Sequence, residues 1–205
     1  MTGMGLRERK KEKTRLALVD AALDLFLEHG YDTTTIDQVA GSADVSPRTF
    51  FRYFTSKDHL ILWFHDQMEE TMLEALAARP AGEPPFASMT HALRAQLRTM
   101  EEATPEDVER FLKVRRLLDA TPHLASSAYA RAIETERRLV ETVAARRGLD
   151  PADNPLPHLV VSFVMASLRV GLTCPADPAD LPEIVRRMEE TLQLVERSLR
   201  PGWDS

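Results

Sequence analysis

The stretch GYDTTTIDQVAGSADVSPRTFFRYFTSKDHL, residues 30–60, decides the fold. Thr34 and Asp37 match a capping box, in which the threonine hydroxyl accepts the Asp37 N–H and the carboxylate reaches back. A turn follows, and Ser46 with Pro47 forms a favourable helix start, because the N–H that proline lacks has no partner at the first helical position. The stretch therefore predicts two short helices separated by a tight turn.

The second short helix, expected to run from Ser46 to about Phe54, has two unlike faces. Phe50 and Phe54 are four residues apart, so they share one face and are expected in the core. The opposite face carries Pro47, Arg48, Phe51 and Arg52. Arginine can bridge O6 and N7 of guanine, while phenylalanine and proline can contact thymine methyl groups. This predicts a helix-turn-helix whose second helix enters a DNA major groove. The spacing also allows Phe51 to pack against the next helix, with the arginines solvated.

Outward from this stretch, apolar spacing predicts helices throughout. An apolar stripe from Leu16 to Leu27 ends at Gly30, and a cap at Thr55–Asp58 opens a helix that runs to about Ala78. Proline-marked caps divide the remainder into five helices, as at Thr104–Asp107. They are expected over about 85–101, 105–119, 122–147, 155–173 and 181–199. The predicted fold class is all-α, with about nine helices.

The charge is distributed unevenly along the chain. The net charge is −6, yet residues 1–57 hold nine Lys or Arg against eight Asp or Glu. Six of the basic residues crowd between Arg7 and Arg15, which predicts a phosphate-seeking arm or, alternatively, a solvated helix start or a frayed tail. The basic N-terminus lacks the apolar stretch of a secretory signal, and the chain has no run of eighteen apolar residues, so a cytoplasmic protein without a membrane span is expected.

The sequence carries none of the motifs that commonly mark an enzyme or a cofactor site. It has no glycine-rich phosphate loop, no GxSxG and no HExxH, and its six histidines are scattered. The single cysteine, Cys174, excludes an internal disulfide and a CxxC zinc site. No catalytic residue, metal or cofactor is therefore expected. Two alternatives stay open: an enzyme of unrecognised type, and a helical dimer that has lost DNA binding.

Four segments together resemble the DNA-binding signature of the TetR family: Gly30–Ile36, Val39–Ala40, Ala43–Phe54 and Ser56–Leu60. One departure is Asp44, which replaces the glycine usual in the turn, although aspartate tolerates a left-handed backbone better than most residues. The resemblance implies that early positions of the second short helix touch bases and that residues at helix starts touch phosphate. The implied DNA-binding residues are Thr35, Ser46, Pro47, Arg48, Thr49, Phe51, Arg52, Tyr53 and Lys57.

The same resemblance implies two domains: a helix-turn-helix DNA-binding domain over residues 1–56, and a ligand-binding and dimerisation domain over residues 57–205. It implies a homodimer that binds a palindromic double-stranded DNA operator and responds to a small, apolar effector. Repression of transcription is expected, and activation is the alternative. A methionine-rich wall suits such an effector, although ordinary core is the other interpretation of each residue. The expected ligand-binding residues are Trp63, Phe64, Met68, Met72, Met89, Leu93, Leu97, Phe111 and Tyr129.

The segment Leu159–Val170 is apolar nearly all round, which predicts burial on more than one side. Family members usually pair through their last two helices, so a partner chain is expected there; packing within one chain is the alternative. The expected dimerisation residues are Phe163, Val164, Ser167, Leu168, Met188, Leu192 and Val195.

Overall fold

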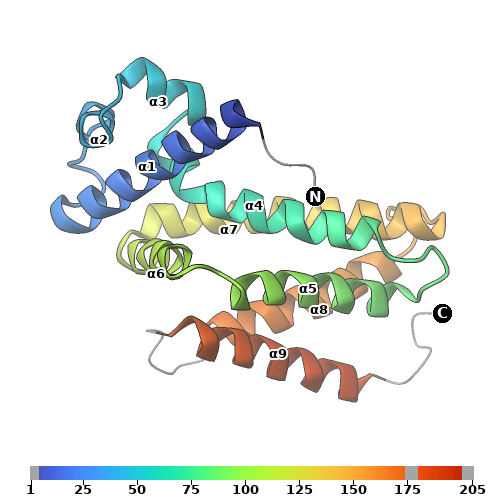
Figure 1. Ribbon diagram of the computed structural model, residues 1–205. Coiled ribbons are helices and arrows are strands. Elements are labelled where there is room, and N and C mark those ends of the chain that lie inside the picture. Colours follow the sequence, from blue (N-terminus) through green and yellow to red (C-terminus); the bar gives the residue numbers. More distant parts are fainter. Residues whose placement is uncertain (1–4, 174–179, 200–205) are drawn as a thin grey trace. The chain divides into compact units, whose positions relative to one another are not determined.

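The computed structural model describes residues 5–173 and 180–199, and within them the chain forms nine α-helices and no strand (Figure 1). This confirms the predicted all-α fold. Cys174 lies outside the described residues. The helices are α1 (Leu6–His29), α2 (Ile36–Ser42), α3 (Pro47–Tyr53), α4 (Lys57–Ala77), α5 (Pro85–Glu101), α6 (Pro105–Ala120), α7 (Pro122–Arg147), α8 (Leu156–Thr173) and α9 (Leu181–Ser198).

Proline and capping side chains set many of these starts. Helices α5, α6 and α7 each begin at a proline, as the sequence predicted. At α6, the Asp107 N–H donates to the Thr104 hydroxyl at 3.2 Å. At α4, the His59 N–H donates to the Ser56 hydroxyl at 3.0 Å, while the Thr55 N–H donates to His59 Nδ1. These bonds satisfy N–H groups that have no partner inside a helix.

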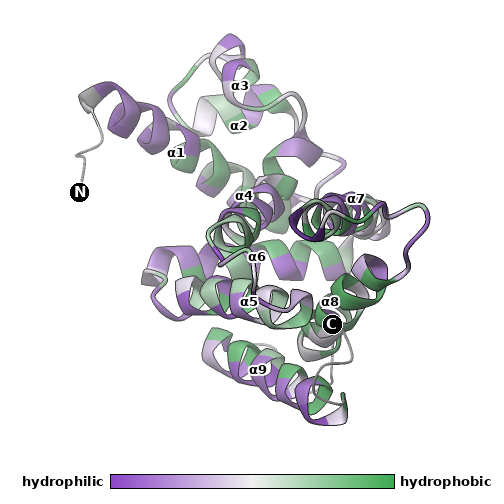
Figure 2. Cartoon of the chain, turned by 90° about the vertical axis from the view of Figure 1, so that its right-hand side faces the viewer, coloured by the Kyte–Doolittle hydropathy of each residue, from purple (hydrophilic) through white to green (hydrophobic). Residues whose placement is uncertain are grey.

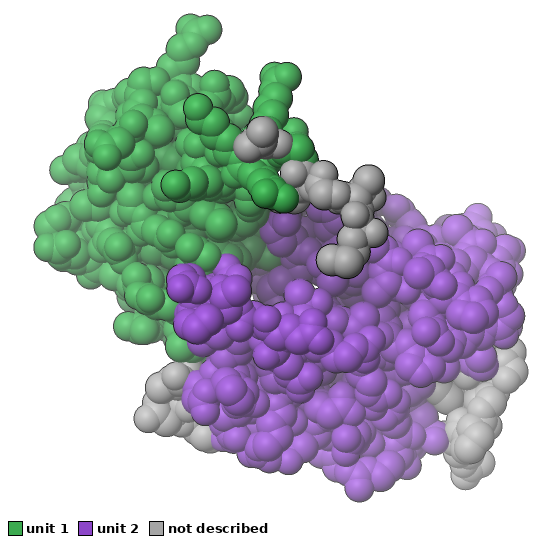
Figure 3. Space-filling model, in the orientation of Figure 1, with its two compact units in different colours: residues 1–64, 109–128 green, residues 65–108, 129–205 purple. Residues whose placement is uncertain are grey.

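The chain divides into two compact units, coloured separately in Figure 3. Unit 1 consists of residues 1–64 and 109–128, and unit 2 of residues 65–108 and 129–205. Unit 1 is larger than the 1–56 domain expected from the sequence, because its core includes side chains from α6 and α7. Val114, Leu117 and Leu124 belong to the same buried cluster as Phe26 and Phe50.

In unit 2, α5 packs against α8 and α9, and α8 packs against α9. Gly171 of α8 lies so close to α9 that a Cβ atom built there would be 2.6 Å from the Cα atom of Met188. Figure 2 shows α9 with separate hydrophobic and hydrophilic faces. The apolar face of α9 is buried. Arg94 of α5 forms ion pairs with Glu189 of α9 at 2.8 Å and with Glu196 at 2.7 Å.

By length and composition, α8 is the one helix in the described part of the chain that could cross a membrane. Its mean hydropathy over Leu156–Thr173 is 1.5. Val160, Val161 and Val164 are nevertheless buried inside unit 2, where α8 packs against α5 and α9. One side of α8 is thus packed within unit 2, while Leu159 and Val170 are exposed.

Buried charge joins the unit 2 parts of α4 and α7. Glu69 is 4% exposed, and its carboxylate accepts hydrogen bonds from Arg138 and from the Thr135 hydroxyl. One turn away, Arg131 Nε donates to Asp66 at 2.8 Å. Both oxygens of the buried Glu69 carboxylate therefore have partners, as a charge in a protein interior requires.

The loop between α4 and α5 is organised around Glu83, whose side chain is 14% exposed. Arg79 donates to it through Nε at 2.7 Å, and the Ser88 hydroxyl does so at 3.0 Å. Nδ1 of His91 lies 2.9 Å from the same carboxylate. The Arg79 hydrogen bond, supported by those of Ser88 and His91, lowers the pKa of Glu83 to about 2.

Candidate nucleic-acid interface

The first short helix, α2, is capped by Thr35 and Gln38. The Gln38 N–H donates to the Thr35 hydroxyl at 3.2 Å, and the Thr35 N–H donates to Gln38 Oε1 at 2.8 Å. The predicted capping box of Thr34 and Asp37 is therefore wrong by one residue. Thr34 is buried, and its hydroxyl donates to the carbonyl of Gly30 at 2.8 Å, so it closes the preceding turn instead.

The turn after α2 is a Schellman motif. The Val45 N–H donates to the carbonyl of Ala40 at 2.9 Å, and the Asp44 N–H donates to that of Gly41 at 3.1 Å. The backbone of Asp44 is in the left-handed region, with φ of 53°. The sequence anticipated this conformation, because Asp44 replaces the glycine usual in the turn. The left-handed residue reverses the chain and directs α3 away from α2.

Ser46 caps α3 as predicted: the Thr49 N–H donates to its hydroxyl at 3.2 Å, and the two hydroxyls lie 3.0 Å apart. Phe50 is fully buried, whereas Phe51 is 56% exposed. The ring of Phe51 touches the edge of Phe50, with 5.5 Å between centroids. The alternative in which Phe51 packs into the core against the next helix is therefore wrong.

The outward face of α3 gathers the predicted base-contacting residues. Pro47, Arg48, Phe51 and Arg52 are all exposed on a seven-residue helix whose other side is buried. Neither arginine has a carboxylate partner among the described residues. The guanidinium of Arg52 lies over the ring of Tyr53, 5.2 Å from its centroid. Its Nη2 also donates to the Tyr53 hydroxyl at 3.5 Å, so Tyr53 holds Arg52 in place, and a guanidinium has further N–H donors.

Lys57, predicted to contact phosphate, is engaged within unit 1. Its Nζ donates to the carbonyl oxygens of Tyr31 at 2.7 Å and Thr34 at 2.8 Å, and lies 4.4 Å from the Tyr31 ring centroid. The Tyr31 hydroxyl donates to the Asp58 carboxylate. Burial, followed by the effect of Asp58, raises the pKa of Tyr31, so the hydroxyl remains a donor. Together these bonds tie the start of α4 to the turn before α2.

Little in the sequence indicates these hydrogen bonds of Lys57, because their acceptors are backbone carbonyls. An ammonium group has three N–H donors, so one donor of Lys57 remains for phosphate.

The N-terminal turns of α1 carry a basic surface. Helix α1 begins at Leu6, so these residues form a helix start, and Figure 2 shows its first turns as hydrophilic. The exposed side chains without a carboxylate partner among the described residues are Arg7, Arg9, Lys10, Lys11 and Lys13. Arg15, in contrast, pairs with Glu12 at 2.7 Å.

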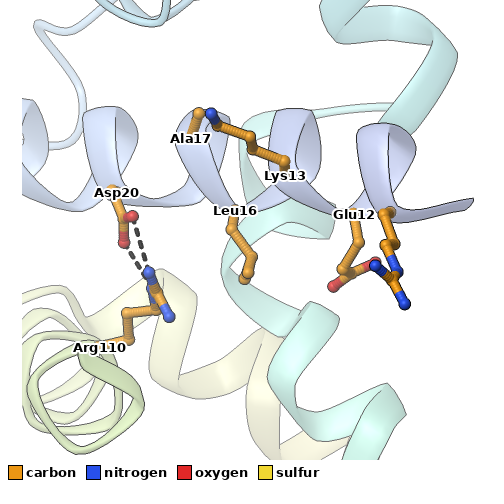
Figure 4. Close-up of a pocket in the computed structure, with 7 residues that line it drawn as sticks. Glu12, Lys13, Leu16, Ala17, Asp20 and Arg110 are labelled. Carbon is orange, nitrogen blue, oxygen red and sulfur yellow. Dashed lines mark hydrogen bonds and ion pairs between the residues drawn. The ribbon is translucent and has the colours of Figure 1, made fainter. Parts of the chain in front are cut away.

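Further along α1, acidic residues bind α6. Figure 4 shows a shallow groove between the two helices, with Arg110 reaching Asp20 across its floor. Nε of Arg110 lies 2.6 Å from Asp20, and Nζ of Lys113 lies 2.6 Å from Asp24. Asp20 and Asp24 of α1 are thus paired with α6, whereas the basic residues of its first turns have no carboxylate partner among the described residues.

The expected ligand-binding residues are divided between the units. In unit 2, Met72, Met89, Leu93 and Leu97 are buried core residues, and Met68 is half-buried. In unit 1, Trp63 and Phe64 are half-buried against that unit's core, and Phe111 is also half-buried. Tyr129 is 62% exposed on the surface of unit 2.

The expected dimerisation residues also differ in exposure. Four of them are buried within unit 2 itself: Val164, Ser167, Met188 and Leu192. Phe163, Leu168 and Val195 are half-buried. The large exposed apolar residues of this region lie instead at Leu159 and Val170 on α8, Ile133 on α7 and Leu194 on α9.

Within residues 5–173 and 180–199, no three side chains of His, Cys, Asp or Glu gather as a metal site would require.

Two family models match the chain. The model described as "Bacterial regulatory proteins, tetR family" matches residues 18–62, which include the helix-turn-helix. The model described as "MftR C-terminal domain" matches residues 83–200. The chain is also 41% identical over 170 residues to the HTH-type transcriptional regulator TcmR of Streptomyces glaucescens, a match that covers 82% of this chain and 75% of TcmR.

Solved structures share the fold. NalD of Pseudomonas aeruginosa, described as the secondary repressor of the MexAB-OprM multidrug efflux pump, is 22% identical, with a TM-score of 0.59. The match covers 94% of this chain and 100% of NalD. The fatty acid degradation regulator FadR of Bacillus halodurans is 15% identical, with a TM-score of 0.55, and the match covers 97% and 99% of the two chains.

Proposed function

The chain belongs to the TetR family of bacterial transcriptional regulators, a family of DNA-binding proteins rather than enzymes, and from that premise we propose that it represses transcription as a homodimer on a palindromic operator. A small, largely apolar effector releases the dimer from DNA. The protein acts in the cytoplasm and needs no cofactor for binding.

The observation that carries this proposal is the outward face of α3. Arg48 and Arg52, neither paired with a carboxylate among the described residues, lie beside the exposed ring of Phe51 and the exposed Pro47. An arginine fork matches the two acceptors of guanine, and an apolar ring matches a thymine methyl group. Arg48, near the helix start, reads bases, with Ser46 and Thr49 beside it. Arg52, held over Tyr53, binds phosphate with the Tyr53 hydroxyl.

Phosphate contacts outside α3 come from three places. Thr35 and the N-terminus of α2 present N–H groups and partial positive charge, and the remaining donor of Lys57 lies at the start of α4. The basic turns of α1 between Arg7 and Lys13 add charge without a partner. Counterions released from phosphates by these groups supply affinity that does not depend on sequence.

For the homodimer, we favour the outer face of α8 as the contact with the second copy. Leu159 and Val170 are exposed there, with Phe163 half-buried between them. Arg169 pairs with Glu136 of α7 at 3.6 Å, next to the exposed Ile133. The buried Val164 and Met188 support this face from within. A twofold dimer presents two α3 helices to half-sites about one DNA turn apart, which explains a palindrome.

The proposed effector acts through helices that belong to both units. Helix α4 contributes residues to unit 1 up to Phe64 and to unit 2 from His65, and α6 changes unit at Glu109. Within unit 2, the effector-binding wall consists of Met68, Met72, Met89, Leu93 and Leu97. An effector shifts the population only by its preference for one of two states, so it must bind the DNA-free arrangement more tightly.

A gel shift with the DNA that flanks the protein's own gene tests the proposal. With several phosphate contacts, we expect affinity to fall by roughly a thousandfold between about 50 and 200 mM salt. A DNA fragment of equal length and scrambled sequence is the control, and it should bind far more weakly. Absence of any shift at low salt would refute the regulator and favour a helical dimer that does not bind DNA.

A further inference from the structure

The amide oxygen of Gln96, in the middle of α5, is buried without a hydrogen-bond partner among the described residues. The residue is 4% exposed, and no described residue donates a hydrogen bond to its Oε1 atom. The other buried polar residues of α5 behave differently. The Ser88 hydroxyl donates to Glu83, and the Thr90 hydroxyl donates to the carbonyl of Ala87. Buried polar atoms are nearly always paired, so the unpaired acceptor of Gln96 calls for an explanation.

The position of Gln96 on α5 shows which side of the helix it occupies. Successive residues turn by about 100°, so Gln96 lies about 200° around the helix from Arg94. Arg94 pairs with Glu189 and Glu196 of α9. Gln96 therefore faces away from α9. Figures 1 and 2 both place α5 between α9 on one side and the unit 2 parts of α4 and α7 on the other. Gln96 thus belongs to the side of α5 that is turned away from α9.

This side of α5 is otherwise apolar. Met89, Leu93 and Gln96 are spaced at i, i+4 and i+7, and the first two are fully buried. Met72 of α4 is 2% exposed within the same unit. A methionine wall repacks readily around an apolar guest. Gln96 is accordingly an uncharged hydrogen-bond acceptor in an adaptable apolar wall.

We propose that Gln96 recognises the effector, and that this effector is a neutral, largely apolar molecule with a hydroxyl or N–H group that donates to Oε1. A cationic donor fits less well because the buried charge on α4, Glu69, is already neutralised by Arg138 and bonded to Thr135. This inference rests on the proposed effector response and names the chemical class of the effector.

A matched pair of probes tests the donor directly. 1-Naphthol and 1-methoxynaphthalene have similar apolar bodies, but only the first carries a donor. For the full chain, we expect isothermal titration calorimetry to show roughly tenfold tighter binding of 1-naphthol, the effect of one net hydrogen bond. In Gln96→Met, which keeps the volume and loses the acceptor, the two probes should bind equally. The control Gln67→Met, at an exposed position on α4, should keep the preference.

The opposite results overturn the proposal. They are equal binding of both probes by the unchanged protein, a preference that survives Gln96→Met, or no saturable binding of 1-naphthol. A thermal scan without probe adds a second readout. Gln96→Met should keep or raise the Tm, because an unpaired acceptor is removed; a fall of several degrees would show that Oε1 is already satisfied. Operator binding, measured by gel shift without probe, distinguishes failure of this inference from failure of the proposed regulator.

Discussion

The Nζ atom of Lys57 lies 2.8 Å from the carbonyl oxygen of Thr34. A second bond, to the carbonyl of Tyr31, uses another of its three donors. The family resemblance implies a DNA phosphate contact for this lysine. In the structure, its two hydrogen bonds join the start of α4 to the turn before α2. The orientation of the helix-turn-helix therefore depends on a residue that lies outside it.

Replacing Lys57 with methionine keeps the aliphatic stem and leaves both carbonyls without this donor. We expect the free energy of unfolding to fall by roughly 1–3 kcal/mol, measured by urea denaturation followed by circular dichroism. Operator affinity should fall for all sequences alike. Lys10→Met, at an exposed residue of α1, should lower the salt dependence of binding but leave stability unchanged. Unchanged stability in Lys57→Met would mean that the lysine serves DNA alone.

Arg48 and Arg52 differ in their surroundings and should differ in their effect on binding. Arg48→Ala should remove roughly 1–3 kcal/mol of discrimination between the operator and a mutated half-site. Arg52→Ala, which removes the guanidinium stacked on Tyr53, should weaken binding to both DNAs equally. Gel shifts with the operator, once footprinting has located it, and with a single-base variant of it measure the difference. Equal loss of discrimination in both variants would contradict the division into base and phosphate contacts.

Asp44 holds a left-handed conformation for which glycine is better suited. It also places a carboxylate at the negative end of α2. Asp44→Gly should therefore stabilise unit 1 by about 1 kcal/mol and raise the Tm in a thermal scan. Asp44→Ala removes the same charge but keeps a Cβ atom, so it separates the two causes: a rise of the same size in both variants would assign the effect to charge rather than backbone.

The dimer face can be located by charge substitution. If α8 forms the interface through its outer side, Val170→Glu should weaken the dimer by roughly a hundredfold, because the carboxylate would be buried without a partner. Sedimentation velocity over a range of protein concentrations measures this change. Leu194→Glu on α9, also at an exposed apolar residue, is the matched variant and should leave the dimer intact. The reverse outcome would move the interface to α9.

Glu83 should make unit 2 sensitive to acid. Its pKa is lowered to about 2, chiefly by Arg79, so its stabilising effect is complete above the ordinary glutamate value of about 4.3 and is lost as the pH falls towards 2. In Glu83→Gln, the urea midpoint should depend less on pH over this window. Glu70→Gln, at an exposed carboxylate without an ion-pair partner among the described residues, should retain the pH dependence of the unaltered chain. Identical pH profiles for both variants would show that Glu83 contributes nothing.

Local chemistry made most of the fold predictable. The serine and proline at positions 46 and 47, and the threonine and aspartate at positions 104 and 107, form caps whose partners lie within three residues. Such bonds depend on the sequence alone, so the helix starts could be placed closely. The error at Thr34 arose where adjacent threonines offered two similar caps, and the Gln38 amide, which accepts from the Thr35 N–H, distinguishes them.

Long-range packing was not predictable in the same way. Periodicity indicated that Val164 and Met188 are buried, but it does not say whether the same chain or a partner covers them. Nor does it reveal that Val114 of α6 completes the unit 1 core. The hydrogen bonds of Lys57 and the unpaired oxygen of Gln96 depend on residues that the fold brings together. No regular spacing along the sequence predicts either feature.

The close approach of Gly171 to α9 has a genetic consequence. Any side chain at this position would meet the backbone of Met188, which cannot yield as a flexible side chain can. Every missense change at codon 171 should therefore push apart two helices that support the proposed pairing face. In a screen for regulators that no longer control their promoter, such mutants would resemble DNA-binding mutants, although the residue belongs to unit 2 and not to the helix-turn-helix.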